Sequence, residues 1–221
     1  MKYLFLILFS FNSFASMQIL STSKWKYNSS ATKQFPLALV ANKNSYWSDR
    51  DKTRAAVDKL QQIFMTCDVA FSEVDFWVVK FSDDVLEPIR KPNPYKGPGE
   101  IAVAKLSNLP SVRPLGLLFA TDIPSTAKAY NAESVRRLRT ATIDPSALLN
   151  TFFMTHDWYD NRRVPGGTDS YDTMAHELAH ILGNMGHIDV FANLMSTYDG
   201  EGSKTGDLTP EQCELIQSFS N

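Results

Sequence analysis

The sequence has no excess of positive charge and no long apolar segment, and each absence excludes a class of partner. Lysine and arginine together number 22 against 24 aspartates and glutamates, which gives a formal net charge of -2 at pH 7. Without a basic field, nothing indicates a nucleic-acid partner. The one apolar run near the start is shorter than the ~20 residues that a membrane-spanning helix needs, so we expect no membrane anchor.

Internal repeats are also absent, and only two cysteines and four histidines occur among the 221 residues. A chain of this length suits one domain, and a hydrophobic content of 43% with 12% aromatic residues is enough for a real core. Neither cysteine is spaced like a metal ligand relative to the histidines. We therefore expect a single domain that acts as a monomer.

The first 15 residues have the pattern of a secretory signal peptide. Lys2 supplies the positive charge, Tyr3 to Phe11 form a short apolar run, and Ser13 and Ala15 place small residues where a signal peptidase reads them. A buried first strand is the alternative. We expect removal of residues 1–15 to leave a mature domain of residues 16–221, either secreted or periplasmic.

Export changes the interpretation of the two cysteines. An oxidising compartment favours a bridge between Cys67 and Cys213, the only available pair. Such a bridge would close a long loop, which the chain-entropy model values at about 4–5 kcal/mol. Two buried free thiols are the alternative.

Strand and helix patterns are mixed along the chain, which is typical of an α+β fold. Expected strands, rich in β-branched and aromatic residues or in short apolar runs, are 35–42, 74–81, 101–106, 115–123 and 138–143. Two helices are expected to flank the central part of the chain. The first, within 48–67, opens with Ser48 and Asp51 at capping-box spacing.

The second of these helices closes the sequence and has a complete start signal. Thr209 is the expected N-cap, Pro210 suits the first helical position, and Gln212 completes the capping box. A helix is therefore predicted to begin at Pro210.

A third helix carries the residues that indicate chemistry. His176 and His180 are four residues apart, so on a helix both imidazoles face the same side and can reach one metal ion. Glu177 lies beside them but not at ligand spacing, and it suits the role of proton acceptor from a metal-bound water. Ser170 or Asp172 can cap this helix, and we expect Gly183 to end it with a positive φ.

The segment HELAHILGNMGH, followed by NLMS, resembles the metzincin metallopeptidases, and among them the matrixin-like members. The resemblance implies a zincin fold, in which a twisted mixed sheet accompanies an active-site helix and a C-terminal helix. It also implies that His176 and His180 bind Zn²⁺, that Glu177 is the general base, and that Met195 is the Met-turn residue beneath the metal. A looser similarity to small bacterial matrixin relatives extends over the bridged helices.

The sequence departs from the family pattern at the third zinc ligand. The pattern places that ligand at residue 186, which is Gly186 and has no side chain to bind a metal. His187 follows directly, and the chain beyond Gly183 need not be helical, so an extra residue need not rotate His187 away. We predict His187 as the third ligand, with Asp189 as the main competitor and a glutamate from a later helix as a further option. Glu201 lies at a suitable distance from His180, but its glycine-rich segment is hardly helical.

Three other residues near the motif have ordinary alternatives. Met195 is by position alone a candidate core methionine. Tyr198 follows it at an offset that makes a role at the metal a weak hypothesis against an ordinary wall residue. His156 is more often a structural or surface histidine than a further ligand, although Asp157 and Asp160 nearby would allow a secondary metal site.

These observations predict a zinc-dependent endopeptidase that acts on protein or peptide substrates. Zn²⁺ would activate a bound water, and Glu177 would take its proton and later give it to the leaving amine. We expect the substrate to lie extended against an edge strand, for which 115–123 is the candidate. A non-proteolytic zinc-binding secreted protein with a metzincin-like fold and a secreted binding module with an incidental motif are the alternatives.

Overall fold

The structure is a computed structural model that describes seven segments of the chain. They are residues 17–82, 114–118, 129–131, 151–154, 170–190, 192–196 and 204–219. The expected signal peptide and the expected strands 101–106 and 138–143 lie outside these residues. So do His156, Asp157, Asp160, Tyr198 and Glu201, and they stay predictions.

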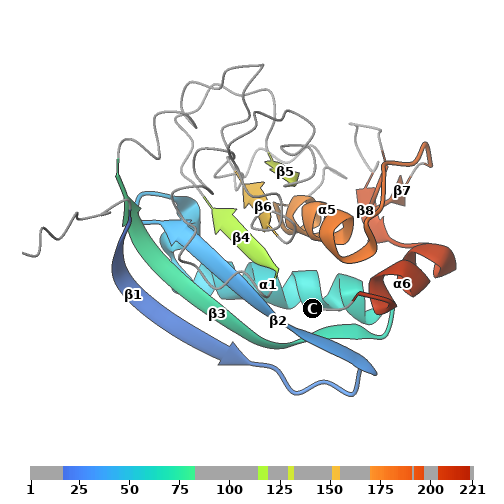
Figure 1. The fold of residues 1–221 in the computed structure, drawn as a ribbon, viewed down its shortest axis with the longest axis horizontal. Coiled ribbons are helices and arrows are strands. Elements are labelled where there is room, and N and C mark those ends of the chain that lie inside the picture. Colours follow the sequence, from blue (N-terminus) through green and yellow to red (C-terminus); the bar gives the residue numbers. More distant parts are fainter. Residues whose placement is uncertain are drawn as a thin grey trace, which may run out of the picture.

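Six strands form one mixed, twisted sheet, as Figure 1 shows. They are β1 (Met17–Lys26), β2 (Lys33–Asn42), β3 (Val69–Phe81), β4 (Leu115–Leu118), β5 (Ala129–Asn131) and β6 (Thr151–Met154). Their order is β1-β3-β2-β4-β6-β5. The outer pairs β1/β3 and β5/β6 are antiparallel, and the inner pairs are parallel. The expected α+β class with a mixed sheet is confirmed.

The sheet corrects the choice of edge strand. β4 pairs with β2 on one side and with β6 on the other, so residues 115–118 of the candidate form an inner strand. Residues 119–123 of that candidate lie outside the described residues. An inner strand has no free backbone groups to offer a peptide. The strand at that end of the described sheet is β5, which is antiparallel to β6 and contacts the helix that carries the histidines.

The strands β2 and β3 were expected and are longer than predicted. In β2, Leu37, Leu39 and Ala41 pack into the main core, and Ala38 and Val40 on the other face are also buried. Burial of both faces is typical of strands with parallel neighbours and explains the near-continuous apolar sequence. Apolar and polar residues therefore do not alternate in the middle of β2, where both faces of the strand are buried.

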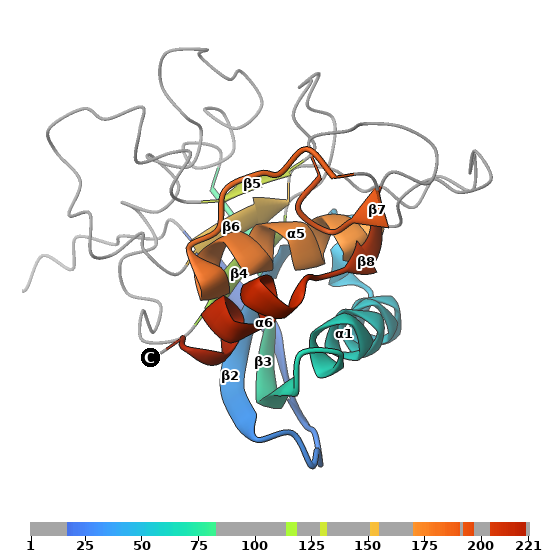
Figure 2. The same cartoon turned by 90° about the vertical axis from the view of Figure 1, so that its right-hand side faces the viewer.

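Three helices pack on one face of the sheet (Figures 1 and 2): α1 (Arg50–Met65), α5 (Ser170–Gly183) and α6 (Pro210–Gln217). Leu60 and Phe64 of α1 meet Leu178 of α5 in one apolar cluster with Leu37 and Leu39 of the sheet. This core fixes the place of α5 over the sheet.

The start of α1 differs from the expected capping box. Ser48 belongs to a short 3-10 helix, η1 (Tyr46–Ser48), and its hydroxyl donates to the Ser45 carbonyl at 2.7 Å. Because that hydroxyl is engaged, Asp49 is the N-cap, and its carboxylate accepts from the backbone N–H groups of Asp51 and Lys52. The predicted cap is one residue too early.

The expected disulfide is confirmed. Cys67, just after α1, is bonded to Cys213 of α6, with the two Cα atoms 4.9 Å apart. Gln217 adds a second link, because its Nε2 donates to the Cys67 carbonyl at 2.7 Å. The capping box of α6 is also confirmed, with Thr209 and Gln212 in their predicted roles.

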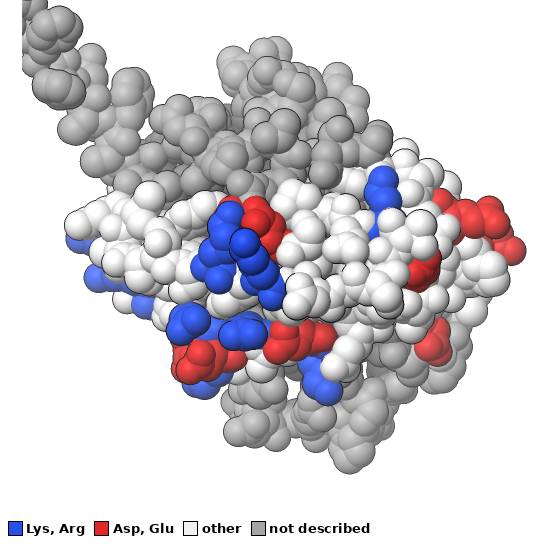
Figure 3. All heavy atoms as spheres, turned by 90° about the horizontal axis from the view of Figure 1, so that it is seen from below, with Lys and Arg blue, Asp and Glu red and all other residues white. Residues whose placement is uncertain are grey.

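The described surface has no patch of one charge on the face that Figure 3 shows, where basic and acidic side chains lie side by side. For example, Nζ of Lys24 lies 3.0 Å from Oε1 of Glu73 and 3.3 Å from Oδ1 of Asp75. None of the described helices is both long and apolar enough to cross a membrane.

Candidate metal centre

Helix α5 buries three polar side chains together with its apolar ones. Met174 and Leu178 are fully buried, as expected for a helix packed on a core. His176, Glu177 and His180 are also buried, at 5%, 6% and 9% exposure. Buried ionisable side chains are costly unless they are paired or bind a metal, so three of them within two turns require a chemical reason.

The end of α5 is built differently from the expected glycine cap. The helix does end at Gly183, but the residue with positive φ is the next one, Asn184, at 47°. Gly183 is needed for a close approach instead, because a Cβ there would lie 2.7 Å from both Cγ and Cε of Met185. At Gly186 a Cβ would meet nothing within 4 Å, and its φ is not in the positive region. Residues 170 and 172 both lie inside the helix, so neither Ser170 nor Asp172 is its N-cap.

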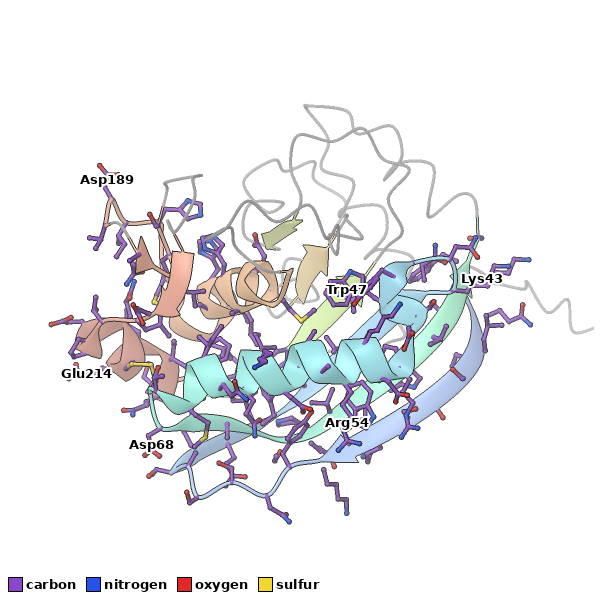
Figure 4. The ribbon with its side chains drawn as sticks, turned by 180° about the vertical axis from the view of Figure 1, so that it is seen from behind. Lys43, Trp47, Arg54, Asp68, Asp189 and Glu214 are labelled. Atoms are coloured by element: carbon purple, nitrogen blue, oxygen red, sulfur yellow. A yellow bond between two sulfur atoms is a disulfide. The ribbon has the colours of Figure 1, made fainter. Side chains whose placement is uncertain are left out.

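The turn after α5 brings His187 back to the two helical histidines. The Nε2 atom of His187 lies 3.0 Å from Nε2 of His176 and 3.2 Å from Nε2 of His180. The Nε2 atoms of His176 and His180 are 3.1 Å apart. These three residues form the one group in the described part of the chain that could hold a metal ion. Asp189, the expected competitor, is exposed and points outward from the loop (Figure 4).

Backbone carbonyls fix two of the three rings. Nδ1 of His176 lies 2.6 Å from the Leu194 carbonyl oxygen, and Nδ1 of His180 lies 2.6 Å from that of Met185. A carbonyl can only accept, so each Nδ1 must carry the hydrogen and donate it. In the neutral ring the lone pair is then on Nε2, the nitrogen that faces the other histidines.

The spacing of these nitrogens fits a tetrahedral metal ion. Nitrogens bound to Zn²⁺ at about 2.0–2.1 Å with tetrahedral angles lie about 3.3 Å from one another. The three Nε2 separations of 3.0–3.2 Å are close to that value. A backbone carbonyl on the second ring nitrogen is the usual outer partner of a metal-binding histidine. The donor set therefore fits a metal site.

Met195 is a core methionine, the ordinary alternative for this residue, and its place beneath a metal stays a prediction. It is fully buried and belongs to the same apolar cluster as Leu178 of α5. Its carbonyl accepts from the Ile188 N–H at 2.9 Å, which joins the turn to the segment that carries His187. The side chain thus belongs to the hydrophobic core, and the backbone of Met195 is joined to the His187 segment.

Sequence reasoning missed the residues that orient the rings. The carbonyls of Met185 and Leu194 are backbone groups, which every residue possesses, so no residue type could have indicated them. Asn193 and Gln212, whose side chains hydrogen-bond to each other, were also missed. The identity of Asn193, directly before Leu194, was the one signal in the sequence, because its burial is visible only in the structure.

Comparison with known proteins gives limited help. No family model matches the chain, and no curated protein matches it. Among solved structures, the crystal structure of metalloproteinase-II from Bacteroides fragilis is similar, with a TM-score of 0.46 and 13% identity over 86% of this chain and 55% of that one. The chain spans about half the length of that protein, and its function is inferred below from its own residues.

Proposed function

We propose that this protein is a zinc-dependent endopeptidase of the metzincin type, similar to the matrixins. The observation that carries the proposal is the convergence of three imidazole Nε2 atoms within 3.2 Å of one another. Glu177 directly follows the first of these histidines in the same helix, and its side chain is also buried.

Zinc is the metal that this donor set suits best. Three imidazoles would hold the ion and leave a position open, which is the arrangement of catalytic rather than structural zinc sites. Both cysteines are in the disulfide, so thiolates do not compete as ligands. When bound, the ion would lower the pKa of a water towards about 7 and polarise a carbonyl oxygen.

Glu177 would supply the proton transfer. Its place in α5 keeps it off the ligand face shared by His176 and His180, because neighbouring residues on a helix point about 100° apart. The carboxylate would accept a proton from the attacking water and then deliver it to the leaving amine. Burying a carboxyl side chain at 6% exposure is costly and gives little packing benefit, which supports a chemical role for Glu177.

The substrate would be a protein or peptide in an extended conformation. β5 is the last strand of the described sheet on the side of α5, and it contacts that helix. A peptide added to this edge could form main-chain hydrogen bonds, the usual mode of strand addition. His187 is exposed, so a peptide substrate could approach the site from solvent.

We propose that the protein works outside the cytoplasm, secreted or periplasmic, as a monomer of residues 16–221. The disulfide supports this, because such bonds persist in oxidising compartments. The signal peptide itself lies outside the described residues and stays a prediction.

The test compares the zinc-loaded parent with Glu177→Gln on denatured protein and a diverse peptide pool. The glutamine keeps size and hydrogen bonding but accepts no proton, so zinc should stay bound while turnover falls about 10²–10⁴-fold. Glu214→Gln, an exposed position on α6, is the matched control and should cleave at the parental rate.

Equal cleavage by the parent and Glu177→Gln would contradict Glu177 as the base. If the parent binds zinc and cleaves nothing, the alternative of a non-proteolytic zinc-binding protein replaces the proposal.

A further inference from the structure

Two buried amide side chains form a closed pair between the turn that carries Leu194 and α6. Nδ2 of Asn193 donates to Oε1 of Gln212 at 2.9 Å, and Nε2 of Gln212 donates to Oδ1 of Asn193 at 3.2 Å. The two residues are 4% and 7% exposed and come from different elements, β7 (Ala192–Asn193) and α6. Such a pair fixes both amide orientations, because a flip of either would oppose like groups.

Each amide oxygen also holds a backbone N–H on its own side. Oε1 of Gln212 accepts from the Thr209 N–H at 2.8 Å, which is half of the α6 capping box. Oδ1 of Asn193 accepts from the Met195 N–H at 2.8 Å, which spans Leu194 in an Asx-type turn. The pair therefore connects the start of α6 to the turn that carries Leu194.

The hydrogen bond from the Met195 N–H to Asn193 fixes the direction of the Leu194 carbonyl, which is the partner of His176. The Met195 N–H and the Leu194 carbonyl belong to the same peptide group, which is planar and trans. When Asn193 holds the N–H, the carbonyl must point the opposite way, and there it accepts from Nδ1 of His176 at 2.6 Å. The orientation of His176 thus depends on Asn193 through a single rigid unit.

The backbone at this turn is held in an uncommon conformation. Ala192, directly before Asn193, has φ of 68°, a region that residues with a side chain seldom adopt. Such a conformation persists where the surroundings determine it. The Leu194 N–H, bonded to the Asp207 carbonyl at 2.7 Å, is a second restraint on the same turn.

We propose that Asn193 and Gln212 are positioning residues for the metal ligand His176, with Gln212 orienting Asn193 and Asn193 orienting the Leu194 carbonyl. The inference rests on the proposed zinc site and extends it to the C-terminal helix. It concerns metal binding, so it stands whether or not the bound metal serves proteolysis.

The first test replaces Gln212 by methionine, which has a similar shape and helix propensity but no amide. Zinc affinity of the full chain, measured by competition with a chelator, should fall about tenfold, the lower end of the range for outer-shell changes. Gln217→Met is the matched control: it removes an amide hydrogen bond from the same helix, to Cys67, and should leave zinc affinity unchanged. Equal losses in both variants would overturn the proposal in favour of a general helix effect.

The second test separates positioning from stability at Asn193. Asn193→Asp keeps an oxygen for the Met195 N–H, whereas Asn193→Ala removes it. Positioning predicts that the alanine variant loses more zinc affinity than the aspartate variant, although the aspartate variant buries a charge and should unfold more easily. The visible spectrum of the Co²⁺-loaded protein should likewise differ more from that of the parent in Asn193→Ala than in Asn193→Asp. The reverse order in affinity and spectrum would overturn the proposal.

A parent protein that binds zinc but cleaves no peptide would remove the proposed proteolytic function and leave these comparisons intact. A parent that binds no zinc would overturn both.

Discussion

Two regions of the molecule are held together in different ways. Residues 17–82, the sheet-and-helix region, are joined by apolar side chains that fill one core around β2, β3 and α1. Residues 184–213, the ligand-loop region, are described at 184–190, 192–196 and 204–213. Their side chains also reach this core, at Met185, Leu194 and Met195, but the turn itself is fixed by backbone groups that bind particular side chains. Apolar burial is non-directional and tolerates changes of similar volume, whereas a hydrogen bond depends on the position of each atom. We therefore expect substitutions in the first region to change stability and those in the second to change metal binding.

The largest effect on stability should come from the link between the two regions. The Cys67–Cys213 disulfide joins residues separated by 146 positions. Replacing both by alanine should lower the free energy of unfolding by about 4–5 kcal/mol in the chain-entropy model. Urea unfolding of the metal-free protein measures this, with the oxidised parent as reference. A loss below about 1 kcal/mol would show that the unfolded chain gains little freedom from the change.

A core substitution should affect stability alone. Leu60 is fully buried in the sheet-and-helix region, and Leu60→Ala should cost about 2–5 kcal/mol of unfolding free energy through lost burial and a cavity. Zinc affinity of the folded protein should equal that of the parent. A parallel fall in zinc affinity would break the proposed division between the regions.

Loss of a direct ligand should affect metal binding alone. His187→Ala should weaken zinc binding by more than about 100-fold, because even outer-shell changes cost about 10–100-fold. The metal-free protein should keep its stability, since His187 is exposed. Asp189→Ala is the matched control on the same loop and should bind zinc as the parent does. If the aspartate variant loses zinc and the histidine variant does not, the third ligand has been assigned wrongly.

Gly183→Ala should have a smaller effect, which lowers zinc affinity and leaves stability almost unchanged. The new Cβ would press on Met185, whose carbonyl holds the ring of His180. We expect zinc affinity to fall about tenfold, as for other outer-shell changes. Alanine is favoured over glycine in helices by up to about 1 kcal/mol. This gain offsets the cost of the close contact with Met185, so the stability of the metal-free protein should change little. Unchanged zinc affinity would show that Met185 can move without moving its carbonyl.

The smallest effect is on the pH dependence of stability, and it arises within the sheet-and-helix region alone. Burial, and then the hydrogen bond of its hydroxyl to Asp58 at 2.8 Å, raise the pKa of Tyr27. Because the folded-state pKa is raised, the stability from this group is complete below the unfolded value of about 10 and is lost as the pH rises beyond it. Tyr27→Phe should lower stability by about 1 kcal/mol at pH 7 and flatten its decline in alkali. Thermal unfolding across pH 7–11 measures both, and an unchanged alkaline slope would contradict the assignment.

The parts of the structure that the sequence predicts correctly are set by neighbouring residues. The α6 cap is determined within four residues by Thr209, Pro210 and Gln212, and the spacing of His176 and His180 follows from helix geometry alone. The cap of α1 was misplaced because a 3-10 turn engages Ser48. Local spacing could not show that competition.

The rest depends on contacts between distant segments. Strand order decides that β4 is an inner strand, and no property of residues 115–118 reveals its neighbours. β1 was not predicted, because Trp25 is the one described residue in it with a buried side chain and the strand has no alternating pattern. The carbonyls that orient the histidines are set by how the chain returns after α5, which sequence periodicity does not record.

The most direct test is zinc X-ray absorption spectroscopy on the purified parent and on His187→Ala. We predict one zinc per chain, bound in the parent by three imidazole nitrogens at about 2.0–2.1 Å with no sulfur neighbour. The variant should show two imidazoles. A parent spectrum with two imidazoles and a protein carboxylate, unchanged in His187→Ala, would contradict the three-histidine site.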